Sequence, residues 1–231
     1  MQRYFTKVKN DNQFVLSKDD MYHIKTVMRM NNNELLEVVY NKQLYVCYLE
    51  NNNIIIKNKI DSLKSNKVYT VLCLPILQEQ KMSFVLQKAT ELGIDEIIPI
   101  LTTRSVVKID GKQDKKLERW NKIVKEASEQ SKRLDIPIVS TVKKISDLQM
   151  DGLKIMCSTT ESVNSLKKEL KNNPKCDKII IVIGPEGGLS NKEEQELKDL
   201  NFVSVTLGNL IMRVETVPIY LLSVLNYEMM E

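Results

Sequence analysis

The stretch that decides the fold reads KIIIVIGPEGGLSNKEEQ and covers residues 178–195. Its continuous apolar run is typical of a strand that is buried on both faces, as in a parallel sheet. Ser190 is followed three residues later by Glu193, a capping box that predicts the start of a helix. The segment between them therefore lies at the carboxyl end of a strand, which is where α/β sheets bind their ligands.

The loop at residues 184–188 consists of three glycines, one proline and Glu186. Glycine lets the main chain approach a ligand closely and adopt positive φ, and Pro185 holds the residue before it in an extended conformation. The loop matches neither the P-loop pattern nor the dinucleotide-binding pattern. An acid would also repel a phosphate, whereas it is compatible with a cationic or amine-bearing ligand. A plain tight turn between strand and helix is the alternative interpretation.

Strands and helices alternate through residues 71–231, which predicts an α/β domain with a largely parallel sheet covered on both faces. The expected helices include an amphipathic one that ends before Gly93 and a long one over residues 114–133. The other expected strands are VYTVLCLPIL, EIIPIL, PIVSTV, LKIMCS and FVSVTL.

Residues 1–70 follow a different pattern. Short β-rich runs separated by Asn-rich breaks predict a small closed or half-closed barrel. One helix, capped by Ser17 and Asp20, interrupts these runs. Its apolar face is expected to hold Met21, Ile24, Val27 and Met28. We therefore expect two domains, 1–70 and 71–231, joined by the polar segment DSLKSNK.

The composition is that of an ordinary globular protein, with 42% hydrophobic and 28% charged residues. No apolar run approaches the roughly 18 residues of a membrane span, and the N-terminus lacks the apolar segment of a secretory signal. A cytoplasmic location is the expectation. The four cysteines have no metal-ligand spacing and His23 is the only histidine, so no metal site is expected.

The net charge of +4 is unevenly distributed along the chain. Residues 1–70 hold 11 Lys/Arg against 7 Asp/Glu, which accounts for the whole excess. Residues 104–133 form a second basic region, with 10 basic and 5 acidic residues. Two basic regions on a chain that is otherwise near neutral favour a polyanionic partner. Plain solvated faces are the alternative.

A second glycine loop follows a strand in LGNLIMRVET, residues 207–216. The helix after it accommodates Pro218 only in its first turn. Residues 217–225 are apolar nearly all round, so the helix is expected to be buried. It can be buried in the core or against another subunit, and the sequence leaves both possibilities open.

Motifs along nearly the whole chain resemble the bacterial ribosomal RNA small subunit methyltransferase E family, within the SPOUT superfamily. They are RYF, HIKTVMR, KATELGIDEIIPI, TTRSVV, ERWNKIVKEASEQSKR, IGPEGGLS and LGNLIMRVET, and they occur in the order of the family. IGPEGG and the later R-x-E-T are the most specific. The family pattern LGxRILRxETA differs here at Leu210, Met212 and Val217. The G-D pair that tends to follow the R-M stretch is replaced by asparagines 31–33.

The resemblance implies a trefoil-knotted (SPOUT) methyltransferase domain over 71–231 and a PUA-like RNA-binding barrel over 1–70. It implies methylation of N3 of a uridine in the decoding region of 16S rRNA by a homodimer. S-adenosylmethionine is the implied cofactor, held by main-chain groups of the two glycine loops. By position, the residues around it are Thr159, Gly184, Pro185, Glu186, Gly187, Gly188, Leu207, Gly208, Ile211, Met212, Arg213 and Thr216.

Methyl transfer to uridine N3 requires that the imide proton leave, because the neutral nitrogen has no useful lone pair. Glu186 and Glu215 are candidates for the base. Arg104 and Arg213 are candidates for stabilising negative charge on the uracil oxygens. For each of the four residues, a structural salt bridge is the alternative.

Basic side chains of both basic regions are the candidate phosphate contacts for RNA. They are Arg3, Lys25, Arg29, Arg119, Lys122, Lys125, Lys132 and Arg133. Tyr4, Phe5 and Tyr22 are candidates for stacking on bases, with core packing as the alternative, and His23 is expected to be a structural hydrogen bonder. A knotted methyltransferase with another acceptor, such as a ribose 2′-OH, remains an alternative function. A non-catalytic RNA-binding factor is the other alternative, which Leu210 favours and the intact GPEGG loop opposes.

Overall fold

The computed structural model describes residues 1–61, 68–105, 107 and 113–229. The chain forms two compact units, Met1–Ser65 with Glu126–Ile136, and Asn66–Lys125 with Pro137–Glu231. The expected division at residue 70 differs from these units in two respects. The first break falls between residues 65 and 66, and the segment 126–136 belongs to the first unit although the sequence order places it in the second domain. Most of the expected linker lies outside the described residues.

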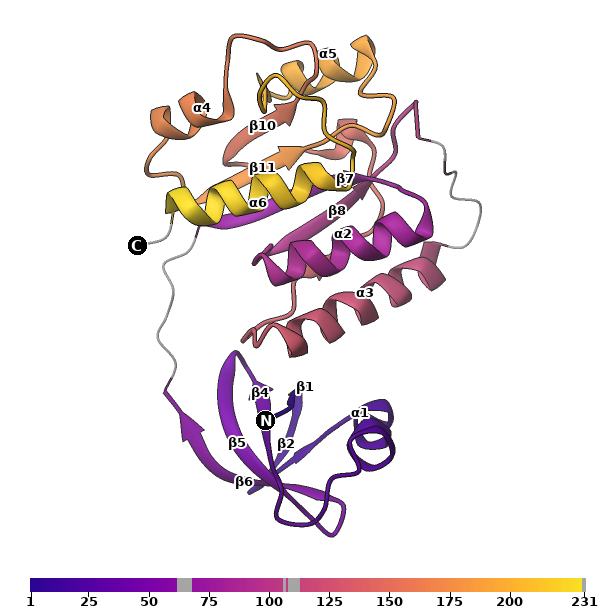
Figure 1. Cartoon of the computed structure of the whole chain (residues 1–231), viewed down its shortest axis with the longest axis vertical. Coiled ribbons are helices and arrows are strands. Elements are labelled where there is room, and N and C mark those ends of the chain that lie inside the picture. Colours follow the sequence, from indigo (N-terminus) through magenta and orange to yellow (C-terminus); the bar gives the residue numbers. More distant parts are fainter. Residues whose placement is uncertain (62–67, 106, 108–112, 230–231) are drawn as a thin grey trace. The chain divides into compact units, whose positions relative to one another are not determined.

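The first unit contains a curled six-stranded sheet in the order β1-β4-β5-β6-β3-β2 (Figure 1). The strands are β1 (Arg3–Thr6), β2 (Val8–Asn10), β3 (Gln13–Val15), β4 (Leu35–Tyr40), β5 (Gln43–Glu50) and β6 (Asn53–Ile60). β1 pairs with β4 in parallel and the other pairs are antiparallel. Its core contains Tyr4, Leu36, Val38, Cys47 and Ile54. The predicted half-closed barrel is confirmed.

The helical segment of the first unit differs from its prediction. Ser17 caps α1 (Lys18–Tyr22), as expected, by accepting a hydrogen bond from the main-chain nitrogen of Asp20. The chain then continues as a π-helix, His23–Val27. Ile24 is fully buried, but Val27 and Met28 are 59% and 46% exposed. The expected common face is wrong because the wider π turn changes the angular spacing on which it depended.

The second unit is built on a six-stranded sheet in the order β12-β10-β11-β7-β8-β9. The strands are β7 (Tyr69–Pro75), β8 (Glu96–Ile100), β9 (Ile138–Val139), β10 (Leu153–Cys157), β11 (Lys178–Val182) and β12 (Val203–Val205). Every pair is parallel, which confirms the expected sheet. β9 is only two residues long, shorter than the PIVSTV run that was expected to form it.

The helices of the second unit cover both faces of this sheet. They are α2 (Glu79–Glu91), α3 (Gln113–Gln130, of which residues 126–130 belong to the first unit), a 3₁₀ turn at Ile145–Asp147, α4 (Leu166–Asn172), α5 (Asn191–Asp199) and α6 (Thr216–Met229). One face of the sheet packs against Leu148, beside the 3₁₀ turn, and against Leu197 of α5. α2 packs beside α6 in front of the sheet (Figure 1). Within the described residues no helix is long and apolar enough to cross a membrane.

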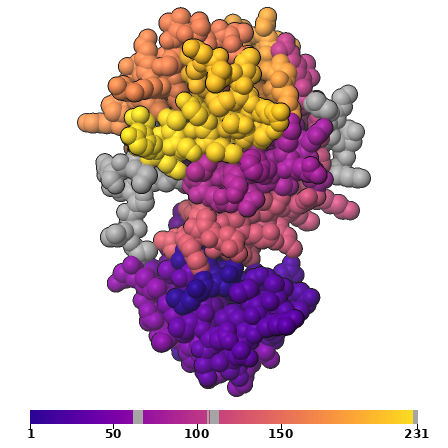
Figure 2. Space-filling model, viewed as in Figure 1, coloured from indigo at the N-terminus to yellow at the C-terminus, as the bar shows by residue number. Residues whose placement is uncertain are grey.

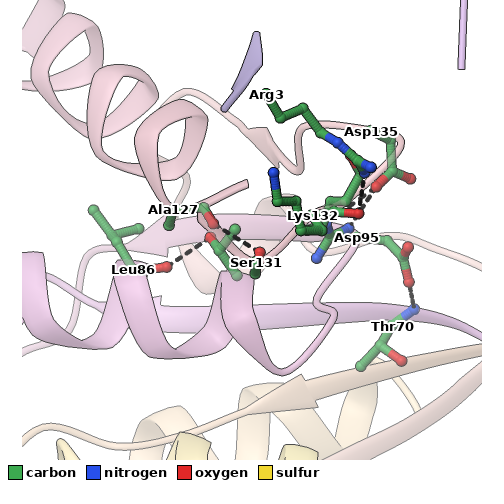
Figure 3. Close-up of polar contacts among 10 residues, drawn as sticks. Arg3, Thr70, Leu86, Asp95, Ala127, Ser131, Lys132 and Asp135 are labelled. Atoms are coloured by element: carbon green, nitrogen blue, oxygen red, sulfur yellow. Dashed lines mark hydrogen bonds and ion pairs between the residues drawn. The ribbon is translucent and has the colours of Figure 1, made fainter. Parts of the chain in front are cut away.

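The predicted helix boundaries depend on short-range signals, and the structure agrees with several of them. Gly93 follows the end of α2 with φ 86°, the left-handed conformation expected after a helix. Trp120 and Val124 of α3 are buried, as their spacing predicted. Asp95, just before β8, accepts a hydrogen bond of 2.8 Å from the main-chain nitrogen of Thr70 and so joins the starts of two neighbouring strands (Figure 3).

Candidate active site

The GPEGG loop leaves the carboxyl end of β11, near the middle of the parallel sheet. The nitrogen of Ile183 still donates to the carbonyl of Cys73 at 3.2 Å, and the chain turns immediately afterwards. The nitrogen of Gly188 closes the turn on the carbonyl of Pro185 at 2.8 Å. Ser190 and Glu193 form the predicted capping box, so α5 begins at Asn191, three residues after the last glycine.

The glycines of this loop differ in what a side chain at each position would meet. A Cβ on Gly184 would lie 2.9 Å from the nitrogen of Leu189 and 3.1 Å from the carbonyl carbon of Gly188. The loop therefore folds back on Gly184 at backbone distance. Gly188 has φ +69° and open space around its missing Cβ. A Cβ on Gly187 would meet only the side chain of Arg104, at 3.4 Å.

Arg104 follows β8 and holds the GPEGG loop in place. Its Nη1 donates to the carbonyl of Gly187 at 2.8 Å and to the carbonyl of Leu189 at 3.1 Å. The sequence placed Arg104 among the catalytic candidates, but the structure assigns its Nη1 to the main chain of the loop. In the structure, the Arg104 side chain therefore stabilises the conformation of the loop.

Glu193 joins the same loop to the segment after β8. Its carboxylate accepts hydrogen bonds from Ser190 and from the main chain and hydroxyl of Thr103. Burial alone would raise the pKa of Glu193, but these hydrogen bonds outweigh it and hold the pKa below its usual value. The carboxylate is therefore ionised at neutral pH and serves as a structural acceptor.

The second glycine loop connects β12 with α6. Gly208 has φ +120° with nothing within 4 Å of a Cβ, and its nitrogen donates to the hydroxyl of Thr206. Val214 is buried and anchors the loop, whereas Leu210 and Ile211 are 84% and 87% exposed. The side chain of Arg213 is exposed, and its carbonyl accepts the hydrogen bond from Thr216 that starts α6.

Lys81 connects the acids of the two glycine loops. It lies in the first turn of α2, and its Nζ is 2.7 Å from Oε1 of Glu186 and 3.6 Å from Oε2 of Glu215. The hydrogen bond from Lys81 holds the pKa of Glu186 below its usual value and raises the pKa of Lys81. Among the described residues, Oε2 of Glu215 is buried and accepts no hydrogen bond.

The sequence did not single out Lys81. A signal was present, because Lys81 lies shortly after the carboxyl end of the buried strand β7, and that edge was already expected to hold the ligand.

The segment after β10 also lies at this edge of the sheet. There Ser158 is buried and donates to Glu194 at 2.8 Å, while Thr159 is exposed.

The structure thus brings most of the predicted cofactor and catalytic residues to one edge of one sheet. Strands β8, β10, β11 and β12 are parallel, so the segments that follow them lie at the same edge. The residues gathered there include Arg104, Thr159, Gly184–Gly188, Leu207, Gly208 and Ile211–Thr216. Within the described residues no group of three or more His, Cys, Asp or Glu could hold a metal ion.

The RNA-binding prediction is wrong for Arg3. Its side chain is buried, with Nε 2.9 Å from Oε2 of Glu37. Its Nη1 donates to the carbonyls of Lys132 and Arg133, as Figure 3 shows for Lys132. Arg133 is also largely buried and donates to Asp135 at 2.8 Å, so it too is unsuited to a phosphate contact.

The other basic candidates differ in exposure. Lys25 and Arg29 are exposed on the segment around the π-helix. Arg119 is 57% exposed and pairs with Glu79, Lys122 is exposed, and Lys125 is half-buried. Lys132 is 45% exposed and pairs with Glu37 at 3.2 Å.

The stacking candidates of the first unit separate in the same way. Tyr4 is buried, and its hydroxyl is hydrogen-bonded to Nδ1 of His23 at 2.9 Å, so both are structural. Burial raises the pKa of Tyr4 well above its usual value. Phe5 is half-buried, and Tyr22 is 63% exposed. Only Tyr22 of the three retains a face suited to stacking.

Comparison with known proteins agrees with this geometry. A family model described as an RNA methyltransferase domain matches residues 64–226. The chain belongs to this family of RNA methyltransferases. The match covers the whole parallel sheet together with both glycine loops.

Relatives similar over their full length narrow the family. Ribosomal RNA small subunit methyltransferase E of Mesomycoplasma hyopneumoniae is 36% identical, over 96% of this chain and 98% of that protein. The Bacillus subtilis protein of the same name is 34% identical, over 99% of this chain and 97% of that protein. The Neisseria gonorrhoeae enzyme of this name, in a crystal structure bound to S-adenosyl methionine, has a TM-score of 0.86 at 26% identity. That match covers 98% of this chain and 97% of that one. The family resemblance carried by the motifs is confirmed.

Proposed function

We propose that this protein transfers a methyl group from S-adenosylmethionine to N3 of a uridine in the decoding region of 16S rRNA, in the cytoplasm. The observation that carries the proposal is the meeting of two glycine loops at the carboxyl edge of one parallel sheet, each loop bringing one acid to Lys81. The full-length relatives named for small-subunit rRNA methylation support the substrate class.

The residues present fit the proposed cofactor. Gly188 and Gly208 leave open space where side chains would stand, so main-chain groups are accessible to a ligand. Lys81, Glu186 and Glu215 together carry one net negative charge, which suits a ligand with a sulfonium and an ammonium. Gly184–Gly188, Leu207, Gly208 and Ile211–Arg213 would hold it, with Thr159 and Thr216 at the margins.

When bound, the cofactor would supply a methyl group activated by a positively charged sulfonium. The leaving group is then a neutral thioether. The residues of this chain must remove the N3 proton of the uracil so that the nitrogen lone pair can form the new bond. Glu215 and Glu186 are the candidate acceptors of that proton. The hydrogen bond from Lys81 holds the pKa of Glu186 below its usual value, so Glu186 is a weaker base than a glutamate without such a partner. Arg213 is exposed and can offset negative charge on the uracil oxygens.

The test of the function uses small-subunit rRNA from cells that lack this protein. Purified protein with isotopically labelled S-adenosylmethionine should add one methyl group, and nuclease digestion with mass spectrometry should place it on a uracil base. A label on ribose would instead support the 2′-OH alternative. No label, together with retained RNA binding, would support a non-catalytic factor.

Lys25 and Arg29 are expected to contact RNA phosphates. Changing both to alanine should make the log–log dependence of RNA affinity on salt less steep by about 1.4, at about 0.7 per contact with single-stranded RNA. Filter binding at several salt concentrations measures this slope. The control is Lys57→Ala with Lys59→Ala, which removes the same charge from an exposed part of β6. An equal change in the control would show that net charge alone is responsible.

A homodimer is expected from the apolar character of α6. Figure 2 shows much of this helix at the surface of a single chain, and Tyr220 and Tyr227 are 40% and 82% exposed. Light scattering at micromolar concentration should give the mass of two chains. Tyr220→Glu with Tyr227→Glu should shift the mass to one chain, whereas Val8→Glu, at an exposed apolar residue of the first unit, should not. A monomeric wild-type protein would contradict this expectation.

A further inference from the structure

Lys81 occupies a position that neither glycine loop can provide by itself. The helix that carries it starts four residues after β7, whereas Glu186 follows β11 and Glu215 precedes α6. Three chain segments that are distant in sequence therefore meet at one ammonium group. The two ion pairs differ in length, 2.7 Å to Glu186 and 3.6 Å to Glu215, so Glu186 is the closer partner.

The surroundings of the cluster suggest more than surface charge pairing. The side chain of Glu215 is 20% exposed, and its buried Oε2 accepts no hydrogen bond among the described residues. A buried acceptor without a hydrogen bond costs free energy of folding, and a role in binding or catalysis is one explanation for such a group. The Lys81 ammonium is the only cation within ion-pair distance of this oxygen in the described part of the chain.

We propose that Lys81 is a positioning residue for methyl transfer: its ammonium holds Glu186 and Glu215 in one arrangement and so sets the separation of the two glycine loops that bind the cofactor. The inference rests on the proposed function. Lys81 acts through the two acids and needs no contact with the reacting atoms. Removing it releases each acid from the other loop and leaves two uncompensated carboxylates side by side.

The helix that carries Lys81 supplies a matched control. Lys88 also lies on α2, is exposed to the same degree and pairs with a glutamate, Glu91, at 2.8 Å. That pair lies within one helix and connects no loops. Lys81→Met and Lys88→Met thus remove similar ion pairs. Of these, only the ion pairs of Lys81 connect the two cofactor loops.

The experiment measures S-adenosylmethionine affinity of the full-length chain by calorimetry. Lys81→Met should weaken binding about tenfold, Lys81→Arg should restore most of the affinity, and Lys88→Met should bind as wild type does. The losses caused by Lys81→Met and Glu186→Gln should not add: the double variant should lose less affinity than the two single variants together, because both changes remove the ion pair between the two residues. Circular dichroism confirms that each variant is folded.

A pH series separates positioning from simple structural support. In the wild-type protein Lys81 keeps the pKa of Glu186 low, so the carboxylate stays ionised on mild acidification. Without Lys81 that pKa rises, and affinity for the cationic cofactor should begin to fall at a higher pH than in wild type. The Lys88→Met variant should keep the wild-type profile.

Two results would overturn the inference. Equal cofactor affinity and pH profile in Lys81→Met and Lys88→Met would show that the link between the loops has no role. Unchanged cofactor affinity with weakened RNA binding would make Lys81 a phosphate contact instead. Failure of the wild-type chain to bind S-adenosylmethionine at all would count against the proposed function. That outcome differs from both results that would overturn the inference about Lys81.

Discussion

Replacing Gly184 with alanine is expected to weaken binding of S-adenosylmethionine by about one to two orders of magnitude while the rest of the sheet stays folded. The added Cβ would lie 2.9 Å from the Leu189 nitrogen and within 3.2 Å of two atoms of Gly188, all of them backbone. Backbone cannot rotate away as a side chain can, so the turn must open. Overpacking of this kind costs about 1–3 kcal/mol, roughly a 5- to 150-fold loss if it acts only on the binding-competent loop. Calorimetric titration measures the loss.

Gly187→Ala is the matched control for this experiment. Its Cβ would meet only the flexible side chain of Arg104, at 3.4 Å, and Gly187 has no positive φ that would strain an alanine. Affinity is therefore expected to change by less than about threefold, a few tenths of a kcal/mol. If Gly187→Ala lost binding and Gly184→Ala retained it, the close return of the loop onto Gly184 would not be what shapes the site.

Replacing Arg3 with alanine is expected to destabilise the first unit by about 3 kcal/mol, because it removes one partner of a buried ion pair. The guanidinium joins Glu37 of β4 to the carbonyls of Lys132 and Arg133, so one substitution leaves three acceptors without this donor. Urea denaturation followed by circular dichroism, with hydrogen exchange of β4 amides, measures the effect. Arg29→Ala is the control, since Arg29 is exposed and its loss should change stability by less than about 0.5 kcal/mol.

The same ion pair predicts the direction of a pH effect. Burial alone would raise the pKa of Glu37, but hydrogen bonds from Arg3 and Lys132 outweigh it and hold the pKa below its ordinary value of 4.5. A carboxyl whose folded-state pKa is lowered stabilises the fold above that ordinary value, and the contribution is lost as the pH falls through the folded-state value. Arg3→Ala should reduce this acid-dependent loss. Unchanged stability with a flatter salt dependence of RNA binding would restore Arg3 as a phosphate contact.

Several features of this protein could be predicted from the sequence because they depend on neighbours along the chain. The apolar run 179–183 indicated a buried parallel strand, and Ser190 with Glu193 indicated where the next helix begins. Both glycine loops follow strands of one parallel sheet. Parallel strands have their carboxyl ends on the same side, so the two loops were expected at one edge of the sheet. The fold class and the position of the site followed from such short-range signals.

Other features were decided only by the tertiary structure. Arg3 has the positive charge expected of an RNA contact, yet it is buried. A segment more than 120 residues later in the chain places two carbonyls beside it. The π turn at His23–Val27 altered which apolar residues share a face. Lys81 became the partner of both Glu186 and Glu215 only once three segments had been brought together. Periodicity and capping report each residue's relation to its near neighbours, whereas charge pairing and burial depend on which distant segments the packed core places within a few ångströms.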